Sequence, residues 1–281
     1  MRALIRLVVV AGLSACGPKD GPLVSPPPAW ELAWSDEFDG AGGTTPDATK
    51  WVLETGTGAN NDGWGNNELQ TYTARPENVS LDGNGNLVIT ARRERFGTRD
   101  YTSARITTQG LFTKKYGRLE ARIKVPAAKG LWPAFWALGA DIKEVSWPEC
   151  GEIDVLEVRG HQPATVISSL HGPQYFGGGA ISKKFTLTDS TFADDFHVFR
   201  AEWDPSRISF SVDDQIFQTV TAHSVLGGGR SWVFDSPFFA ILNLAVGGTF
   251  LTPTGQPDAN TVFPQTLTVD YVRSYTRVQE P

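Results

Sequence analysis

The segment Asp82-Gly83-Asn84-Gly85-Asn86-Leu87-Val88-Ile89-Thr90 joins a tight turn to a short apolar run. Glycine and asparagine readily adopt the backbone angles of tight turns, and the aliphatic and β-branched residues at 87–90 favour an extended strand. Short runs separated by glycine-rich turns recur along the chain, whereas almost no segment shows the 3.6-residue apolar period of an amphipathic helix. This segment and others like it therefore predict an all-β fold.

Three further runs have strand character, at 118–125, 208–213 and 266–271, and glycine clusters occupy 177–179 and 227–229. Many short strands joined by such turns are typical of two stacked antiparallel sheets, which can bend so that one face is concave. With 281 residues, of which 40% are hydrophobic, the chain is long enough to bury the core of one large domain. We expect a single β-sandwich domain with a concave face.

The net charge of the chain is −6, and no cluster of lysine and arginine is dense enough to suggest a nucleic-acid-binding surface. Both features argue against a surface that neutralises phosphate groups, so nucleic acid is not an expected partner. The nine tryptophans are many for this length, and an indole ring can either pack in a core or lie against the apolar face of a sugar. Composition alone leaves both roles open for the tryptophans.

The first fifteen residues have the features of a secretion signal. Arg2 and Arg6 precede an apolar stretch that is too short to span a bilayer. The residues Leu13-Ser14-Ala15-Cys16 resemble the bacterial lipobox, whose cysteine receives a lipid and becomes the first residue after cleavage. This resemblance implies a signal peptide at 1–15 and lipidation of Cys16. The alternative is a leader that is cut nearby, with Cys16 unmodified.

Residues 16–29 are rich in glycine and proline, which predicts an extended, semi-rigid spacer. The folded domain is then expected at 30–281, secreted or held at the bacterial cell envelope by the lipid on Cys16, with no other membrane contact. In a Gram-negative cell the outer membrane is expected, because Gly17 rather than aspartate follows the cysteine. A lipidated Cys16 leaves Cys150 without a partner, so no disulfide is expected.

Three carboxylates follow one another in the segment Glu149-Cys150-Gly151-Glu152-Ile153-Asp154-Val155-Leu156-Glu157. On a strand, Glu152 and Asp154 share one face, whereas Glu157 has the opposite parity. A β-bulge at residues 155 and 156 would bring Glu157 onto the face of Glu152 and would bury both apolar residues, and bulges are frequent beside active sites. The segment therefore predicts a row of three acids on one face of a sheet.

This row has a chemical interpretation. On a concave sheet, Glu152 and Glu157 could approach the separation of roughly 5 to 5.5 Å that a retaining glycosidase needs. Mutual repulsion raises the pKa of at least one carboxyl group, so that one group carries a proton near neutral pH while another stays charged. The spacing alone leaves two other roles open, an exposed acidic strand and a calcium site.

The segment resembles the bulged signature Glu-x-Asp-x-x-Glu of glycoside hydrolase family sixteen, in the form found in bacterial laminarinases. Six other segments resemble that family, and together they cover nearly all of residues 30–277. These segments are Trp34-Ser35-Asp36-Glu37-Phe38-Asp39, Asn66-Asn67-Glu68-Leu69-Gln70, Gly130-Leu131-Trp132-Pro133-Ala134-Phe135-Trp136, Ala201-Glu202-Trp203, Ile241-Leu242-Asn243-Leu244-Ala245-Val246-Gly247-Gly248 and Phe263 to Tyr275.

The resemblance implies a concanavalin-like β-jelly roll with a substrate cleft across its concave sheet. It implies endo-acting hydrolysis of β-1,3-glucan with retention of configuration, with Glu152 as nucleophile, Asp154 as its assistant and Glu157 as acid and base. Laminarin-type glucan is the expected substrate, and mixed-linkage β-1,3-1,4-glucan is a further candidate. No metal or cofactor is required for this chemistry, and the protein is expected to be a monomer.

The resemblance also places seven further residues at the cleft, where they would bind sugar units. They are Trp64, Asn66, Glu68, Trp132, Trp136, His171 and Asn243. Asn243 and Trp232, which is not among the seven, are weaker candidates. The structural alternatives are core packing for the tryptophans and a framework role for His171.

The chain departs from the family pattern after Gly248. It continues with Thr249-Phe250-Leu251-Thr252-Pro253, where many laminarinases have an Asn-Trp-Pro segment. The cleft is therefore expected to differ at this loop.

Some relatives hold a structural calcium ion on the convex side of the molecule. The resemblance implies a carboxylate ligand that matches Asp270, together with backbone oxygens near Glu37. Asp270 could instead cap a turn or pair with Arg273, and both readings stay open at the level of the sequence.

Two other functions remain as alternatives. One is a carbohydrate-binding lipoprotein on the same scaffold, since a fold does not determine a function. The other is a relative that cleaves a different β-linked polysaccharide. The complete row of acids favours an enzyme, because a binding protein needs no proton donor beside two other carboxylates.

Overall fold

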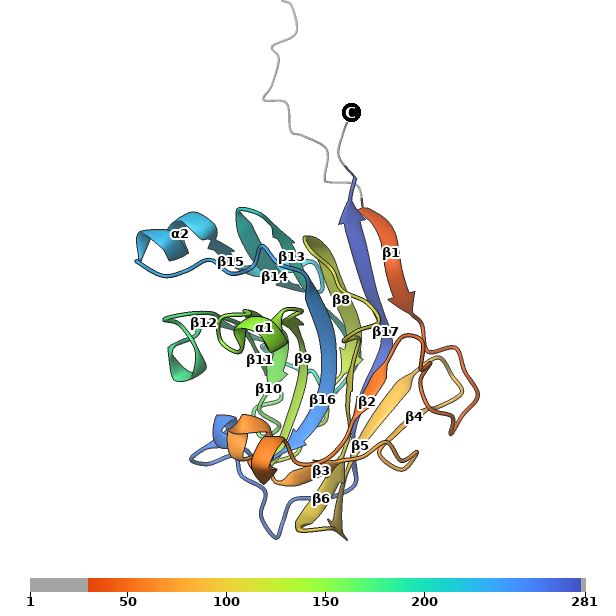
Figure 1. The fold of residues 1–281 in the computed structure, drawn as a ribbon. Helices are drawn as coiled ribbons and strands as arrows, with labels where there is room; N and C mark the ends of the chain where they lie inside the picture. Colours follow the sequence, from red (N-terminus) through yellow and green to blue (C-terminus); the bar gives the residue numbers. More distant parts are fainter. Residues whose placement is uncertain (1–29, 279–281) are drawn as a thin grey trace, which may run out of the picture.

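Two sheets lie face to face in the computed structural model, which describes residues 30–278 (Figure 1). One sheet has ten strands and the other has seven. All strand pairs are antiparallel except one, in which Gln70–Tyr72 runs parallel to Arg99–Ser103. The predicted all-β jelly-roll sandwich is thus confirmed, with this one parallel pair as the difference.

The larger sheet forms the convex side of the molecule. Its main path is β15-β14-β13-β8-β17-β5-β6-β3, with β1 paired to β17 and β4 paired to β5. The bounds of these strands are β1 Trp30–Asp36, β3 Gln70–Tyr72, β4 Val79–Leu81, β5 Leu87–Phe96, β6 Arg99–Ser103, β8 Gly117–Lys124, β13 His197–Asp204, β14 Arg207–Val212, β15 Gln215–Thr221 and β17 Gln265–Arg277.

The smaller sheet covers the other side of the core and bends so that its outer face is concave, as Figure 1 shows. Its order is β12-β11-β10-β9-β16-β7-β2, so the acid-bearing strand β10 lies near its middle. The bounds are β2 Val52–Glu54, β7 Arg105–Thr107, β9 Leu131–Gly139, β10 Glu152–Val158, β11 Thr165–His171, β12 Ile181–Thr186 and β16 Phe238–Val246.

Helical segments are short and lie in the connections. They are η1 Ala59–Asn61, η2 Gly63–Asn67, α1 Ile142–Val145, η3 Gly177–Gly179, α2 Ala222–Gly227 and η4 Thr249–Leu251. No helix within residues 30–278 is both long and apolar enough to cross a membrane.

The core fills the space between the two sheets because each strand turns alternate residues inward. From β10 the residues Ile153, Val155 and Leu156 are buried, and they belong to the same hydrophobic cluster as Leu267 and Val269 of β17. The opposite face of β10 is thereby left to the acids.

The described chain begins and ends on neighbouring strands. Trp30 of β1 pairs with Arg277 of β17, so both ends leave the domain at the same end of the sandwich (Figure 1). The predicted signal peptide at 1–15, the lipidated Cys16 and the spacer at 16–29 lie outside the described residues.

Candidate active site

A bulge in β10 brings the three acids onto one face. Glu152 pairs with His171 of β11, and Asp154 pairs with Ser169, but the register then shifts before Glu157. The same irregularity interrupts the pairing of β10 with β9. The predicted bulge is therefore confirmed, and Val155 and Leu156 are both buried in the core as expected.

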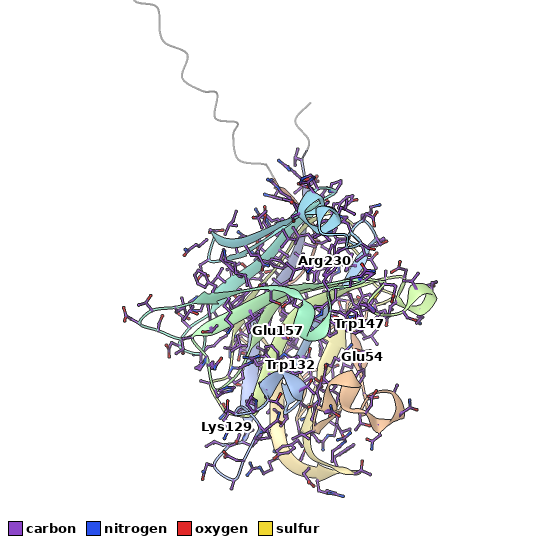
Figure 2. The ribbon with its side chains drawn as sticks, turned by 90° about the vertical axis from the view of Figure 1, so that its left-hand side faces the viewer. Glu54, Lys129, Trp132, Trp147, Glu157 and Arg230 are labelled. Carbon is purple, nitrogen blue, oxygen red and sulfur yellow. The ribbon has the colours of Figure 1, made fainter. Side chains whose placement is uncertain are left out.

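These acids line a cleft of about 1080 Å³ that runs across the smaller sheet. Figure 2 views the molecule from this side and labels Glu157, Trp132 and Trp147 near the middle. The structure brings all of the predicted cleft residues together in the lining, namely Trp64, Asn66, Glu68, Trp132, Trp136, Glu152, Asp154, Glu157, His171 and Asn243. Trp232 differs, because it packs against the core beside Phe234 instead.

Glu157 is buried, and its carboxylate accepts a hydrogen bond from Nε1 of Trp132 at 3.1 Å. Burial, together with the nearby charge of Glu152, raises the pKa of Glu157 to about 7. A carboxyl group with this pKa can exchange a proton near neutral pH, as a general acid and base must.

Glu152 accepts a hydrogen bond from Nε1 of Trp147, with 2.6 Å between the indole nitrogen and Oε2. Burial and the charge of Asp154 raise the pKa of Glu152 above its usual value. The acids of this row titrate together, so the question is which of them keeps a shared proton. Each indole N–H favours the charged form of the carboxylate that accepts it, and the shorter bond, from Trp147, favours the charged form most at Glu152.

Asp154 lies between the two glutamates and next to His171. Burial and the charge of Glu157 raise the pKa of Asp154. Nε2 of His171 is 3.0 Å from Oδ2 of Asp154, although no donor is well aligned with this oxygen. The contact is therefore short but not well aligned.

The protonation of His171 is subject to two opposing influences. Burial, the largest influence, lowers the pKa of its imidazole, but the charge and side-chain contact of Asp154 together with the charges of Glu152 and Glu157 outweigh burial and raise the pKa to about 9. The backbone N–H of Gly177, however, donates to Nδ1 of His171 at 3.1 Å, and this requires Nδ1 without a proton. A neutral ring with its proton on Nε2 satisfies both contacts, and we assign this tautomer.

Glu152, Asp154 and His171 also form the one group within residues 30–278 whose side-chain atoms could jointly approach a metal ion. Their mutual contacts are explained without one, because the imidazole N–H faces the carboxylate of Asp154. The row is therefore interpreted as acid–base machinery.

A second polar network fills the floor of the cleft on the other side of β9. Glu68 is almost fully buried and accepts hydrogen bonds from Gln70 at 2.6 Å and from Tyr72 at 3.0 Å. Nδ2 of Asn243 donates to the hydroxyl oxygen of Tyr72, and Oδ1 of Asn243 accepts from the indole of Trp136 at 2.8 Å. Burial raises the pKa of Glu68, and the network fixes these side chains in place.

The loop that carries Trp64 is shaped by glycine. Gly63 has a φ of +67°, and a Cβ there would lie 2.4 Å from the backbone nitrogen of Glu68, so no larger residue fits. The tight turn holds Trp64 at the rim of the cleft, with its ring 5.5 Å from that of Tyr72.

Arg105 of β7 joins this loop to the sheet, and the sequence offered no reason to single it out. Its guanidinium carbon lies 4.6 Å from the ring centroid of Trp64 and 4.9 Å from that of Trp136. It also forms an ion pair with Glu54 of the neighbouring strand β2. Arginine thus sits between two cleft tryptophans, an arrangement that only the pairing of distant strands creates.

Trp147 was also missed. It lies five residues before Glu152, in Ser146-Trp147-Pro148, and its ring is 5.3 Å from that of Phe176. The proximity of Trp147 to the acid segment was visible, but its contact with Glu152 depends on how the connection after α1 folds back.

At the implied calcium site, the carboxylate of Asp270 and the side chain of Glu37, near which backbone oxygens were expected to bind the ion, are each paired with an arginine. Oδ2 of Asp270 accepts from Arg122 at 2.6 Å, and the carboxylate of Glu37 accepts from Arg273 at 3.0 and 2.7 Å. Arg273 is therefore not the partner of Asp270. The carboxylates as placed therefore do not fit the implied calcium site, and we do not propose calcium binding.

Three comparisons with known proteins place this chain among relatives of similar sequence and fold. The sequence model for "Glycosyl hydrolases family 16" matches residues 66–272. The chain is 40% identical over 259 residues to a β-glucanase of Rhodothermus marinus, covering 90% of this chain and 87% of the relative.

Among solved structures, the endo-β-1,3-glucanase of Pyrococcus furiosus has a TM-score of 0.84 and 46% identity, covering 89% of this chain and 96% of its own. The laminarinase catalytic domain of Thermotoga maritima has a TM-score of 0.83 and 45% identity, covering 89% and 99%.

Proposed function

The chain belongs to glycoside hydrolase family 16 and is an endo-acting β-1,3-glucanase, and on this premise we propose that Glu152 is its nucleophile and Glu157 its general acid and base. The observation that supports these roles is the bulge in β10, which turns Glu152, Asp154 and Glu157 into the same cleft. Two carboxyl groups that flank a sugar bond are the machinery of a retaining glycosidase.

In the first step a carboxylate oxygen of Glu152 attacks C1 of the sugar. The C1–O bond to the leaving sugar breaks, and its oxygen takes the proton of Glu157. The burial of Glu157 and the charge of Glu152 favour this proton near neutral pH. Asp154 adjusts the charge of Glu152 from the next position on the same face of the strand.

In the second step Glu157 is a carboxylate and accepts a proton from water. The water oxygen attacks C1, the bond between C1 and Glu152 breaks, and the sugar leaves with its original β configuration. Trp132 donates to Glu157 and stabilises its charged form between the two steps.

The experiment that tests the roles uses azide as a second nucleophile with an activated aryl β-glucoside. Glu152→Ala leaves space beside the proton donor, so azide is expected to give an α-glycosyl azide. Glu157→Ala still forms the covalent intermediate, because a good leaving group needs no proton, and azide is then expected to give the β-glycosyl azide.

Glu149→Ala is the matched control, because this exposed glutamate lies three residues before Glu152 and outside the cleft. It should keep the activity of the unaltered protein. Azide products of the opposite configuration, or near-normal hydrolysis of laminarin by Glu152→Ala, would contradict the assignment.

We propose that laminarin is cut best and that mixed-linkage glucan is accepted where a β-1,3 bond lies nearby. Discrimination between such bonds depends on a few contacts of about 1 to 3 kcal/mol each. Product mapping on laminarin, lichenan, xyloglucan and agarose tests this order. A preference for xyloglucan or agarose would overturn it.

We also propose that the protein is lipidated at Cys16 and held at the bacterial cell envelope. The support is the lipobox-like sequence Leu13-Ser14-Ala15-Cys16 after a short apolar stretch. Labelled fatty acid should enter the protein in a bacterial host and should be absent from Cys16→Ser. Unlipidated, cytosolic protein in that host would contradict the proposal.

A further inference from the structure

Three planar groups stack beside the acid–base residue. The ring of Phe250 in η4 lies 4.8 Å from the ring of Trp132, with 25° between their planes. The guanidinium carbon of Arg159 lies 4.5 Å from the centroid of Phe250. Nε of Arg159 also donates to the backbone oxygen of Phe250 at 2.9 Å, which fixes the guanidinium at this loop.

Phe250 has little face left for a substrate. An indole and a guanidinium at these distances are too large to share one face of a benzene ring, so they cover its two faces. A sugar could therefore meet only the edge of Phe250. The ring contributes by holding its neighbours rather than as a stacking platform.

The neighbour on one side is Trp132, whose Nε1 donates to Oε1 of Glu157 at 3.1 Å. The indole is also confined by Gly248, where an added Cβ would lie 3.2 Å from Cζ3 of Trp132. Gly248 and Phe250 both pack against the indole, whose N–H faces the carboxyl group of Glu157.

The neighbour on the other side brings a positive charge. Arg159 follows β10 by one residue and has no carboxylate within ion-pair distance among residues 30–278. The other charged or titratable groups facing Glu157 are Glu152 and Asp154 on β10 and His171 on β11. Arg159 is thus a cation without a carboxylate partner, close to this acidic row.

We infer that Phe250 and Arg159 are positioning residues for the acid–base step. Phe250 packs against Trp132 and keeps its N–H within hydrogen-bonding distance of Glu157, and Arg159 holds Phe250 in place by contacting its other face. The inference rests on the proposed role of Glu157. The hydrogen bond and the cation both favour the charged form of Glu157, and both lower its pKa against the effects of burial and Glu152.

The test is the pH dependence of kcat/KM on laminarin. Loss of the Trp132 hydrogen bond should raise the pKa of Glu157, so the proton donor stays protonated to higher pH. The basic limb of the profile, where kcat/KM falls as the pH rises, should then move to higher pH. Trp132→Phe should move it by about one pH unit, and Phe250→Ala should move it in the same direction by less. Phe250→Trp retains an aromatic ring in the stack and should leave the limb in place.

Arg159→Gln and Arg159→Lys separate charge from stacking. Gln removes the cation and should move the basic limb upward, whereas Lys keeps the charge but loses the planar contact and should move it less. If Phe250→Ala does not fold, Phe250→Leu keeps most of the apolar volume without the flat ring.

A second substrate distinguishes positioning from sugar binding or general damage. An activated aryl glycoside needs no proton donor in its first step, so its kcat/KM should hardly change in Phe250→Ala. Equal losses on laminarin and the aryl glycoside, with both limbs of the pH profile unmoved, would overturn the inference. A wrong assignment of Glu157 itself would give a different result: the fall of kcat/KM on laminarin at high pH would persist in Glu157→Ala.

Discussion

Nε2 of His171 faces Oδ2 of Asp154 across the β10–β11 pair at 3.0 Å, while Nδ1 of the same ring accepts the backbone N–H of Gly177. The imidazole therefore joins the middle acid to the glycine-rich loop after β11. Asp154 is held by this contact, and its charge in turn acts on Glu152.

Asp154→Asn should keep more activity than removal of either glutamate. The amide fills the same space but loses the charge, and no bond to the sugar is made or broken by this residue. We expect kcat on laminarin to fall by about 10- to 100-fold, against at least about 1,000-fold for Glu152→Ala. Asp189→Asn, at an exposed position, is the matched control, and a loss in Asp154→Asn as large as that in Glu152→Ala would contradict a supporting role.

The unaltered enzyme should lose kcat/KM on laminarin above about pH 7. Burial and the charge of Glu152 raise the pKa of Glu157 to about 7, and the first step needs this group protonated. Initial rates at low laminarin concentration between pH 4 and pH 10 measure how kcat/KM falls at high pH. A rate that stays level up to pH 9 would be incompatible with Glu157 as the proton donor.

Glu152→Gln should stabilise the protein increasingly as the pH rises. Burial and the charge of Asp154 raise the pKa of Glu152, so the folded state binds a proton that the unfolded state releases above its ordinary pKa of 4.5. The contribution of this group to the free energy of unfolding is fully present below pH 4.5 and is lost as the pH rises towards the pKa of Glu152 in the folded state. The difference in Tm between variant and unaltered protein should grow from pH 5 to pH 9.

The exposed Glu31→Gln is the control for that comparison, because it removes a carboxylate from β1 outside the cleft. Its Tm should follow that of the unaltered protein at every pH. A Tm difference for Glu152→Gln that shrinks with rising pH would contradict a raised pKa of Glu152 in the folded protein.

Arg105→Leu should weaken substrate binding more than catalysis. The guanidinium lies between Trp64 and Trp136, so its removal lets both cleft rings move. We expect KM on laminarin to rise about tenfold with a smaller change in kcat, since each cation–π contact contributes about 0.5 to 2 kcal/mol. Arg105→Lys should recover only part of the loss because the planar contacts need guanidinium.

Glu54→Gln provides the matched comparison, since it removes the ion pair but leaves Arg105 between the rings. Its KM should change less than that of Arg105→Leu. An unchanged KM in Arg105→Leu would show that the tryptophans are held without it.

Chelation should leave the melting temperature unchanged. Asp270 is paired with Arg122 and Glu37 with Arg273, so neither carboxylate needs a cation from solution. Thermal unfolding with EDTA and with added calcium, in otherwise calcium-free buffer, measures the effect. A rise in Tm with calcium would show that the ion displaces an arginine or binds through backbone oxygens.

The sequence alone determined the strands and the face that bears the acids. Side-chain direction on a strand alternates with a period of two. A bulge could therefore be placed from two requirements: the three acids share one face, and Val155 and Leu156 are both buried. These are short-range properties of a single strand. The turn at 82–86 could be predicted for the same reason.

Tertiary structure alone decided the partners of these residues. Arg105 meets Trp64 and Trp136 because β7 and β9 flank β16 and the η2 loop folds over them. Phe250 reaches Trp132 from a loop more than a hundred residues away. Such contacts depend on strand order and on the path of loops across the sheet, and both are set by the packing of the whole core, which no local pattern in the sequence contains.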